Sequence, residues 1–154
     1  MSHVKRGRHG SIIGLRRRNI REHGNSKVAP PAQPLRQYFD LDHSGFYKFD
    51  YARNGASPDR GVELVHPFAI WLKQHHVRGI LTEFGVPNDD PRWLELTQRL
   101  LVYLAHEEIP WIYWAGGPWW GNYRLSAEPK KGIDAPIMSV LTRHYRTISA
   151  EQDQ

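Results

Sequence analysis

Cysteine is absent from this sequence of 154 residues, which excludes a disulfide scaffold and a metal site built on thiolates. Long apolar runs are absent as well, because charged residues interrupt each run before it reaches the roughly 18 residues of a membrane span. A membrane partner is therefore not expected. Hydrophobic residues still make up 40% of the chain, enough for one domain of ordinary size with a packed core.

The first 34 residues lack aromatic side chains and have almost no negative charge. They contain eight Lys and Arg residues against Glu22 alone, whereas residues 35–154 contain 13 Lys and Arg against 15 Asp and Glu. All 18 Phe, Tyr and Trp residues stand at or after Tyr38. A segment of this composition buries too little surface to offset its ordering entropy. We therefore predict a disordered, basic, proline-rich lead segment over residues 1–34.

Other interpretations of this lead segment stay open. An Arg-rich, acid-poor stretch also resembles an organelle presequence or a nucleic-acid-binding arm, and the abrupt change of composition fits a segment that is not the native start. The body of the chain is slightly acidic, so a nucleic-acid partner is not expected. The apolar patch Ser11–Leu15 is too short for a signal-peptide core, so the chain as written is expected in the cytoplasm or in an undetermined compartment.

Residues 35–148 alternate short apolar runs with stretches of helical spacing. The three helical stretches each follow a residue type that caps helices. The predicted helices are 58–76, capped by Ser57, 91–107, capped by Asp90, and 135–146, capped by Asp134. The predicted strands are 35–39, 77–84 and 111–115. Strand, loop and helix in this order, repeated three times, predict an α/β fold with a parallel sheet.

The connections that follow the predicted strands are the long ones. Residues 40–57 and 116–134 are both longer than structureless loops usually are, and such loops are typically functional. In parallel α/β proteins, sites lie at the carboxyl ends of the strands. Tyr38, Glu83 and Trp114 stand at these three ends, so we predict that they lie together.

Glu83 is the sharpest candidate for chemistry. It is the only charged residue in the run Ile80–Gly85, and a carboxylate there is desolvated unless it is paired or hydrogen-bonded. Tyr38 is a possible hydrogen-bond donor to it. The alternatives are a structural carboxylate that caps a helix or binds an arginine, and an ordinary strand-end tyrosine.

Large aromatic residues gather after the third predicted strand, in a glycine-rich loop. Trp114, Trp119 and Trp120 are predicted to bind sugar, since indole faces stack on sugar C–H faces. The alternative is a hydrophobic plug that closes the end of the sheet. No cofactor or metal is expected: the calcium-like pattern that starts at Asp40 has Tyr51 where the pattern needs glutamate.

Several stretches together resemble the carboxy-terminal part of glycoside hydrolase family 5, the cellulase-type endo-β-1,4-glucanases. The stretches are Gln37-Tyr38-Phe39-Asp40 with Ser44-Gly45, Pro67-Phe68 with Trp71-Leu72, Thr82 to Pro87, Asp90 to Trp93, and Tyr113-Trp114-Ala115 through Tyr123. The resemblance implies strands six to eight of a (β/α)8 barrel. It also implies that Glu83 is the catalytic nucleophile, that Tyr38 hydrogen-bonds to it, and that Trp114 is a sugar platform. Full-length relatives are expected to be secreted.

Two departures from the family pattern affect the expected activity. Arg36 occupies the position of a family histidine, and the Asn-Glu-Pro motif of the general acid/base is absent; Glu128-Pro129 lacks the Asn and lies on another segment. A whole barrel needs about 250 residues. We therefore expect a partial barrel over residues 35–148, followed by a tail over 149–154. This partial barrel is expected to be weakly active or inactive.

The expected partner is a β-glucan polysaccharide or oligosaccharide, cleaved with retention, and cellulose, mixed-linkage glucan and mannan all fit the resemblance. One alternative function is a non-catalytic glucan-binding module that uses the Trp-rich loop, and another is a basic-tailed nucleic-acid binder. An incomplete barrel leaves its outer strands bare, so self-association through open sheet edges is a further expectation.

Overall fold

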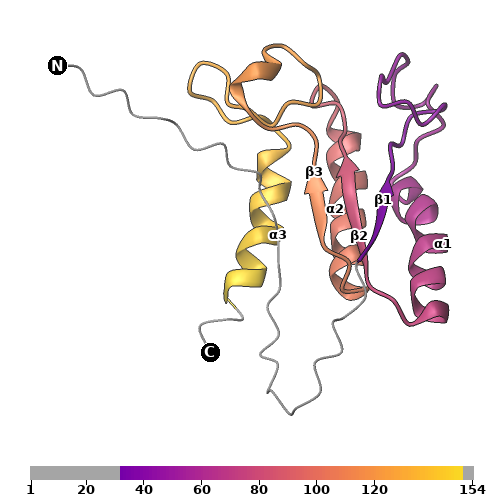
Figure 1. The fold of residues 1–154 in the computed structure, drawn as a ribbon. Helices are drawn as coiled ribbons and strands as arrows, with labels where there is room; N and C mark the ends of the chain where they lie inside the picture. The colour runs from indigo at the N-terminus through magenta and orange to yellow at the C-terminus, as the bar shows by residue number, and fades with distance from the viewer. Residues whose placement is uncertain (1–31, 151–154) are drawn as a thin grey trace.

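The computed structural model describes residues 32–150, with side chains up to residue 145. Seven elements follow one another along the chain (Figure 1): β1 (Gln33–Arg36), α1 (Arg60–His75), β2 (Gly79–Phe84), α2 (Pro91–His106), β3 (Trp111–Tyr113), the 3-10 helix η1 (Pro118–Trp120) and α3 (Met138–Ala150). The strands form a parallel sheet in the order β1-β2-β3. The predicted α/β class and the parallel sheet are thus confirmed. Most of the predicted lead segment and tail, residues 1–31 and 151–154, lies outside the described residues.

Strand β1 begins earlier than the sequence indicated. Gln33 pairs with Gly79, and its N–H donates to the Arg78 carbonyl at 2.8 Å. Pro34 follows as part of the strand, which is possible because β1 lies at the edge of the described sheet, where a missing N–H is tolerated. The boundary predicted after residue 34 therefore cuts into β1.

The helix starts were predicted correctly at one of three positions. Asp90 caps α2, accepting a hydrogen bond from the Arg92 N–H at 2.9 Å. Helix α1 starts at Arg60 after Asp59 rather than after Ser57, and Asp59 makes no side-chain cap bond. Helix α3 starts at Met138, so Asp134 does not cap it.

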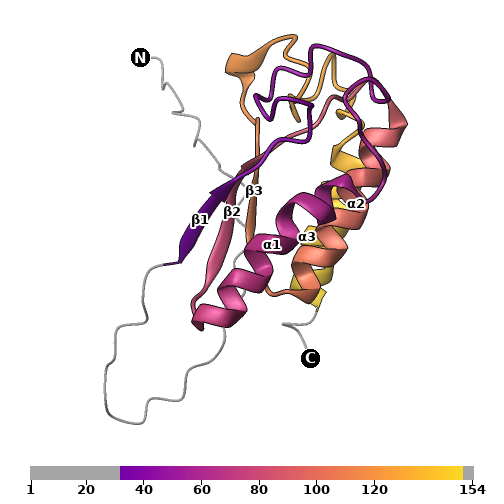
Figure 2. The same cartoon turned by 90° about the vertical axis from the view of Figure 1, so that its right-hand side faces the viewer.

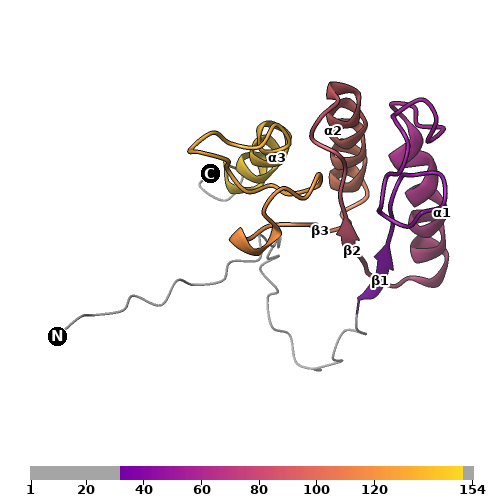
Figure 3. The same cartoon turned by 90° about the horizontal axis from the view of Figure 1, so that it is seen from above.

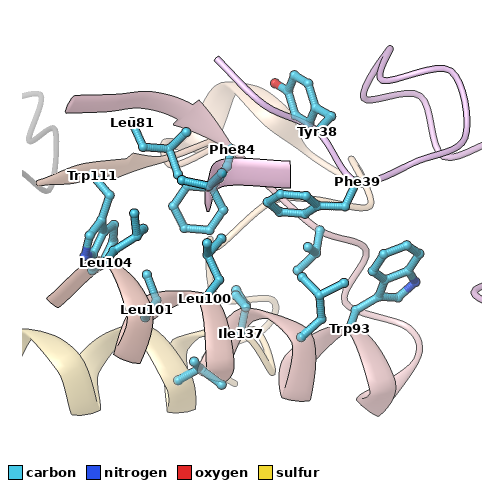
Figure 4. Packing of buried hydrophobic residues seen from close by; sticks show 14 of the residues in the cluster. Tyr38, Phe39, Leu81, Phe84, Trp93, Leu100, Leu101, Leu104, Trp111 and Ile137 are labelled. Carbon is cyan, nitrogen blue, oxygen red and sulfur yellow. The ribbon is translucent and has the colours of Figure 1, made fainter. Parts of the chain in front are cut away.

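The three helices cover one face of the sheet. Figures 2 and 3 show α1, α2 and α3 side by side on that face, and the described residues place no helix on the opposite face. Between sheet and helices lies the core (Figure 4), in which Leu81 and Phe84 of β2 meet Leu100 and Leu104 of α2. Full burial of such a side chain contributes about 1.5–3 kcal/mol, so this layer fixes the sheet on its helices. Within the described chain, no helix is both long and apolar enough to cross a membrane.

Candidate active site

The candidate site lies where the three strands end. The connections that follow β1 and β3 emerge at the same end of the sheet (Figure 1). Tyr38 stands two residues after β1, Glu83 is the penultimate residue of β2, and Trp114 follows β3 directly. Because β2 is the middle strand, Glu83 lies between the loop that carries Tyr38 and the loop that begins at Trp114.

Strand β2 is irregular at the point where it presents Glu83. Its pairing with β1 passes from Leu35–Leu81 to Arg36–Glu83 and skips Thr82. The Thr82 hydroxyl instead donates to the Leu35 carbonyl at 2.9 Å. The pairing of β2 with β3 is irregular over the same stretch. A bulge re-aims the side chains around it, and here it sets Glu83 beside Arg36.

Two side chains contact the same oxygen of Glu83. The Tyr38 hydroxyl donates a short hydrogen bond to Oε1, and Nη1 of Arg36 lies 3.8 Å from that oxygen. The Glu83 side chain is 27% exposed, so solvent reaches the carboxylate. Burial raises the pKa of Tyr38 well above its usual value, and the hydrogen bond to Glu83 raises it further. Tyr38 therefore keeps its proton and remains a donor throughout the ordinary pH range.

The turn that follows Tyr38 packs against its ring. Gly45 lies against the ring: a Cβ atom on this glycine would come within 3.0 Å of three ring carbons. Its φ of +78° is also a conformation that favours glycine. The ring of Tyr47 packs edge-on against the ring of Tyr38, with the two centroids 6.4 Å apart. Figure 4 shows the Tyr38 ring directed away from the helices, whereas Phe39 points into the core.

The turn itself is organised by Asp40, which is 1% exposed. Its carboxylate accepts hydrogen bonds from the N–H groups of Gly45 at 3.1 Å and Tyr47 at 3.2 Å, and from the Ser44 hydroxyl at 2.9 Å. The aspartate cluster that resembled half of a calcium loop thus caps a turn. No group of three metal-binding side chains occurs among the described residues.

Trp114 is brought beside β2 by a close backbone approach. Its N–H donates to the Phe84 carbonyl at 2.7 Å, and the Trp114–Ala115 peptide bond is cis. A Cβ atom on Gly85 would lie 2.0 Å from the Trp114 carbonyl oxygen, so only glycine fits there.

Two further aromatic rings pack beside Trp114. The Trp114 and Trp120 rings meet edge-on with their centroids 4.8 Å apart, and the ring centroids of Tyr123 and Trp120 are 5.2 Å apart. The pKa of Tyr123 is raised by burial, a hydrogen bond from Trp114 lowers it, and the negative charge of Glu83 raises it. Tyr123 therefore belongs to the aromatic group around Trp114 and Trp120.

The three predicted sugar-binding tryptophans differ in exposure. Trp114 and Trp120 are half-buried against each other, whereas Trp119 on η1 is 91% exposed. The loop is anchored by Glu128, whose Oε1 accepts a hydrogen bond from the Gly117 N–H. The partial burial fits the hydrophobic-plug interpretation for Trp114 and Trp120, but Trp119 does not fit it.

Sequence reasoning did not identify Tyr123 as a partner of Trp114 and Trp120, or Glu128 as an anchor of the loop. In the sequence, Tyr123 is only the last residue of a run rich in aromatics. The path of the loop decides which rings of such a run pack together, and the sequence does not show that path. The alternative in which Glu83 binds an arginine agrees with the contact to Arg36. That contact and the bond from Tyr38 occupy the same oxygen.

Comparisons with known proteins give a consistent set of relatives. No family model matches the chain. The probable endo-β-1,4-glucanase B of Aspergillus oryzae is 35% identical over 102 residues, which cover 64% of this chain and 29% of that protein. The endo-β-1,4-glucanase A of Emericella nidulans is 35% identical over 116 residues, or 72% of this chain and 33% of that protein.

Solved structures agree with the sequence relatives. The endoglucanase Cel5A of Pseudomonas stutzeri, solved in complex with cellobiose, superposes with a TM-score of 0.70 at 41% identity, over 74% of this chain and 34% of that one. An endo-β-1,4-glucanase from Xanthomonas axonopodis pv. citri superposes with a TM-score of 0.66 at 32% identity, over 76% of this chain and 37% of that one. The chain thus spans about a third of the length of the proteins it matches. Over that third, this chain is related to the cellulases of glycoside hydrolase family 5.

Proposed function

We propose that this chain contains the nucleophile side of a retaining glycosidase site that acts on β-1,4-glucan. The observation that carries the proposal is the hydrogen bond from Tyr38 to Glu83 at the carboxyl end of a parallel sheet. A partly exposed carboxylate that is fixed by a protonated tyrosine has the chemistry of an attacking group. Its backbone is also held by the bulge in β2.

We propose different tasks for the two oxygens of Glu83. Tyr38 and Arg36 both contact Oε1, so we assign the attack to Oε2. Oε2 forms a bond to the anomeric carbon of the sugar while the bond from that carbon to the leaving oxygen breaks, and a covalent glycosyl-enzyme results. Water then releases the sugar with its configuration retained.

The leaving oxygen also needs a proton, which a second carboxyl group about 5–5.5 Å away supplies in a retaining enzyme. Among the described residues, the side-chain partners of Glu83 are Tyr38 and Arg36, and neither is a carboxylic acid. Loss of a general acid lowers the rate by about 10²–10⁴-fold. We therefore expect weak or no activity on cellulose from this chain alone, and residual activity on aryl glycosides whose leaving groups need little protonation.

The proposed architecture is a part of a (β/α)8 barrel, with β1, β2 and β3 in the places of strands six to eight. The coverage of about a third of each relative supports it, as do three helices packed on one face of the sheet. The proposed domain extends from about residue 33 to residue 148. The free edges of β1 and β3 would then be available for self-association.

The substrate class follows from the relatives and the tryptophans. Solved relatives include complexes with cellobiose and with cellopentaose. Trp119 offers an exposed indole on which a glucose ring can stack. We propose Trp114, Trp119 and Trp120 as the residues that bind β-glucan.

Covalent trapping tests the nucleophile without the missing acid. A 2-deoxy-2-fluoro-β-cellobioside with a dinitrophenolate leaving group should label the chain, and mass spectrometry should find the added sugar on the peptide that contains Glu83. Glu83→Gln should abolish the label. Glu63→Gln, an exposed change on α1, is the matched control and should be labelled like the wild type. A wild-type chain that stays unlabelled, or a label on another residue, would refute the assignment.

A second candidate is a glucan-binding module without catalysis, favoured by the 91% exposure of Trp119. It predicts that the unlabelled chain still binds insoluble cellulose and that Trp119→Ala releases it. Trapping and binding measured together distinguish the two functions.

A further inference from the structure

The loop between β1 and α1 presents apolar side chains to solvent that the proposed site does not use. Leu41 is 57% exposed, Phe49 is 37% exposed and Phe46 is 74% exposed. A phenylalanine this exposed on an otherwise well-packed turn gains nothing from folding. The ring of Phe46 is therefore open to contact by a ligand.

The backbone that presents Phe46 is firmly anchored. The next residue, Tyr47, is fully buried and has a φ of +46°, which is uncommon for a bulky side chain. Its hydroxyl donates to the Gly85 carbonyl at 2.5 Å, and its own carbonyl accepts from Nη1 of Arg124 at 2.7 Å. These bonds tie the turn to the end of β2 and to the loop after β3. The backbone next to Phe46 is consequently anchored, and its side chain stays exposed.

The backbone of this turn lies on the Tyr38 side of the proposed nucleophile. Gly45, the residue before Phe46, lies directly against the Tyr38 ring, and Tyr38 is the donor to Glu83. The backbone of Phe46 thus follows directly on the residue that packs against the Tyr38 ring. A sugar platform on this turn would extend the proposed site beyond Glu83.

Phe46 and Trp119 lie on opposite flanks of Glu83. The strand order β1-β2-β3 puts Glu83 in the middle, with the loop of Phe46 after β1 and η1 after β3. Figure 3, a view from above, shows these two loops on either side of the end of β2. A polysaccharide cut within its length must continue on both sides of the cleaved bond.

We propose that Phe46 is a second sugar-stacking platform, which binds a β-1,4-linked glucose unit on the side of Glu83 away from the Trp-rich loop. The inference rests on the proposed function. The phenyl face would contact the axial C–H groups of the ring. Lys48 and Asp42 stand beside it, with Nζ of Lys48 at 5.9 Å from the Phe46 ring centroid and 3.4 Å from Oδ2 of Asp42, and they can bond to sugar hydroxyls.

A glucan fits this surface better than a protein does. Charged groups separate the exposed rings: Lys48 stands by Phe46, and the Arg53 guanidinium lies 4.6 Å from the Phe49 ring centroid. A protein interface favours a contiguous apolar centre from which charges are depleted. Isolated rings flanked by hydrogen-bonding groups match the alternating C–H faces and hydroxyls of a sugar chain.

Calorimetric titration with cellobiose, cellotetraose and cellohexaose tests the proposal on the full chain. Phe46→Leu keeps an apolar side chain and removes the ring face, so cellohexaose affinity should fall about 3–10-fold. Phe46→Tyr should bind like the wild type. Trp119→Leu should also weaken cellohexaose binding, and Leu41→Ala, on the same loop, is the control that should change nothing.

The outcomes separate this inference from the function on which it rests. If the wild type binds cellohexaose and Trp119→Leu weakens that binding while Phe46→Leu does not, the Phe46 platform is wrong and the proposed function stands. If Leu41→Ala weakens binding as much as Phe46→Leu, the surface is a general apolar contact and the stacking inference fails. If the wild type binds none of the three sugars and resists the fluoroglycoside label, the proposed function falls with it.

Discussion

The absence of a side chain at Gly85 is required both by the fold and by the candidate site. Gly85 follows β2 immediately, and the chain after β3 passes so close that a Cβ atom would lie 2.0 Å from the Trp114 carbonyl oxygen and 3.0 Å from a methyl carbon of Leu125. The first of these neighbours is backbone and cannot rotate away. Gly85→Ala must therefore push the Trp114 segment away from β2.

The magnitude follows from what that displacement breaks. Overpacking in a well-packed region costs typically 1–3 kcal/mol. Here the shift also strains two hydrogen bonds, from the Trp114 N–H to the Phe84 carbonyl at 2.7 Å and from the Tyr47 hydroxyl to the Gly85 carbonyl at 2.5 Å. Each such bond contributes about 0.5–1.5 kcal/mol. We expect Gly85→Ala to lower the free energy of unfolding by about 3 kcal/mol.

Urea unfolding followed by tryptophan fluorescence measures this loss. Gly116→Ala is the matched control, because its added Cβ would meet only Glu128 Oε1, at 4.0 Å, which is an ordinary contact. A Gly85→Ala variant that unfolds at the same urea concentration as Gly116→Ala would refute the reasoning. So would a Gly85→Ala variant that is destabilised but whose fluoroglycoside labelling proceeds at the wild-type rate, since the same shift moves Trp114.

Three further outcomes are expected. Asp40→Ala leaves the N–H donors of the turn without their charged acceptor. A hydrogen bond to a charged group contributes about 1.5–3 kcal/mol, so this change should lower the urea midpoint more than Asp59→Ala, at an exposed position, does. Tyr38→Phe should slow labelling of Glu83 by about tenfold or more while the chain stays folded by near-ultraviolet circular dichroism, and unchanged labelling would contradict the positioning role. Burial, with the charge of Arg143 adding to it, holds the pKa of His144 below 6.5, so the folded state favours the neutral ring. Stability from this group is complete above pH 6.5 and declines as the pH falls below it, and His144→Gln should flatten urea midpoints measured between pH 7.5 and 5.

Much of the architecture could be predicted from the sequence because its signals are local. The stripe of leucines in α2 and the cap at Asp90 are contained in one stretch of chain, and both appear in the structure. The start of α3 was missed because an acceptor far away in the sequence intervenes. Oδ1 of Asn88 binds the Ile137 N–H at 3.1 Å, which holds the residues before Met138 in a turn. Nothing near Asp134 in the sequence announces that bond.

The site follows the same division between local and distant signals. Tyr38 and Glu83 could be placed together because each lies near the carboxyl end of a strand, and parallel strands end at one edge, although β1 ends at Arg36 and not at the predicted residue 39. The bulge that skips Thr82 could not be predicted, because it is a property of the pairing between strands. The packing of Tyr123 on Trp120 depends likewise on how the loop after Trp120 folds back, and the spacing of the aromatics does not encode this path.

The contacts of Glu83 come from adjacent strands of the described sheet and from the turn after β1. Tyr38 supplies the hydrogen bond, Arg36 the positive charge, and the β2 bulge the direction of the side chain. Tyr38 is in turn fixed by the turn around Gly45. Under the proposed function, Glu83 would be positioned as a nucleophile by neighbouring strands alone. Protonation of the leaving group would need a second carboxyl group about 5–5.5 Å away. We therefore propose that the two tasks can be tested separately, and the trapping experiment isolates the first of them.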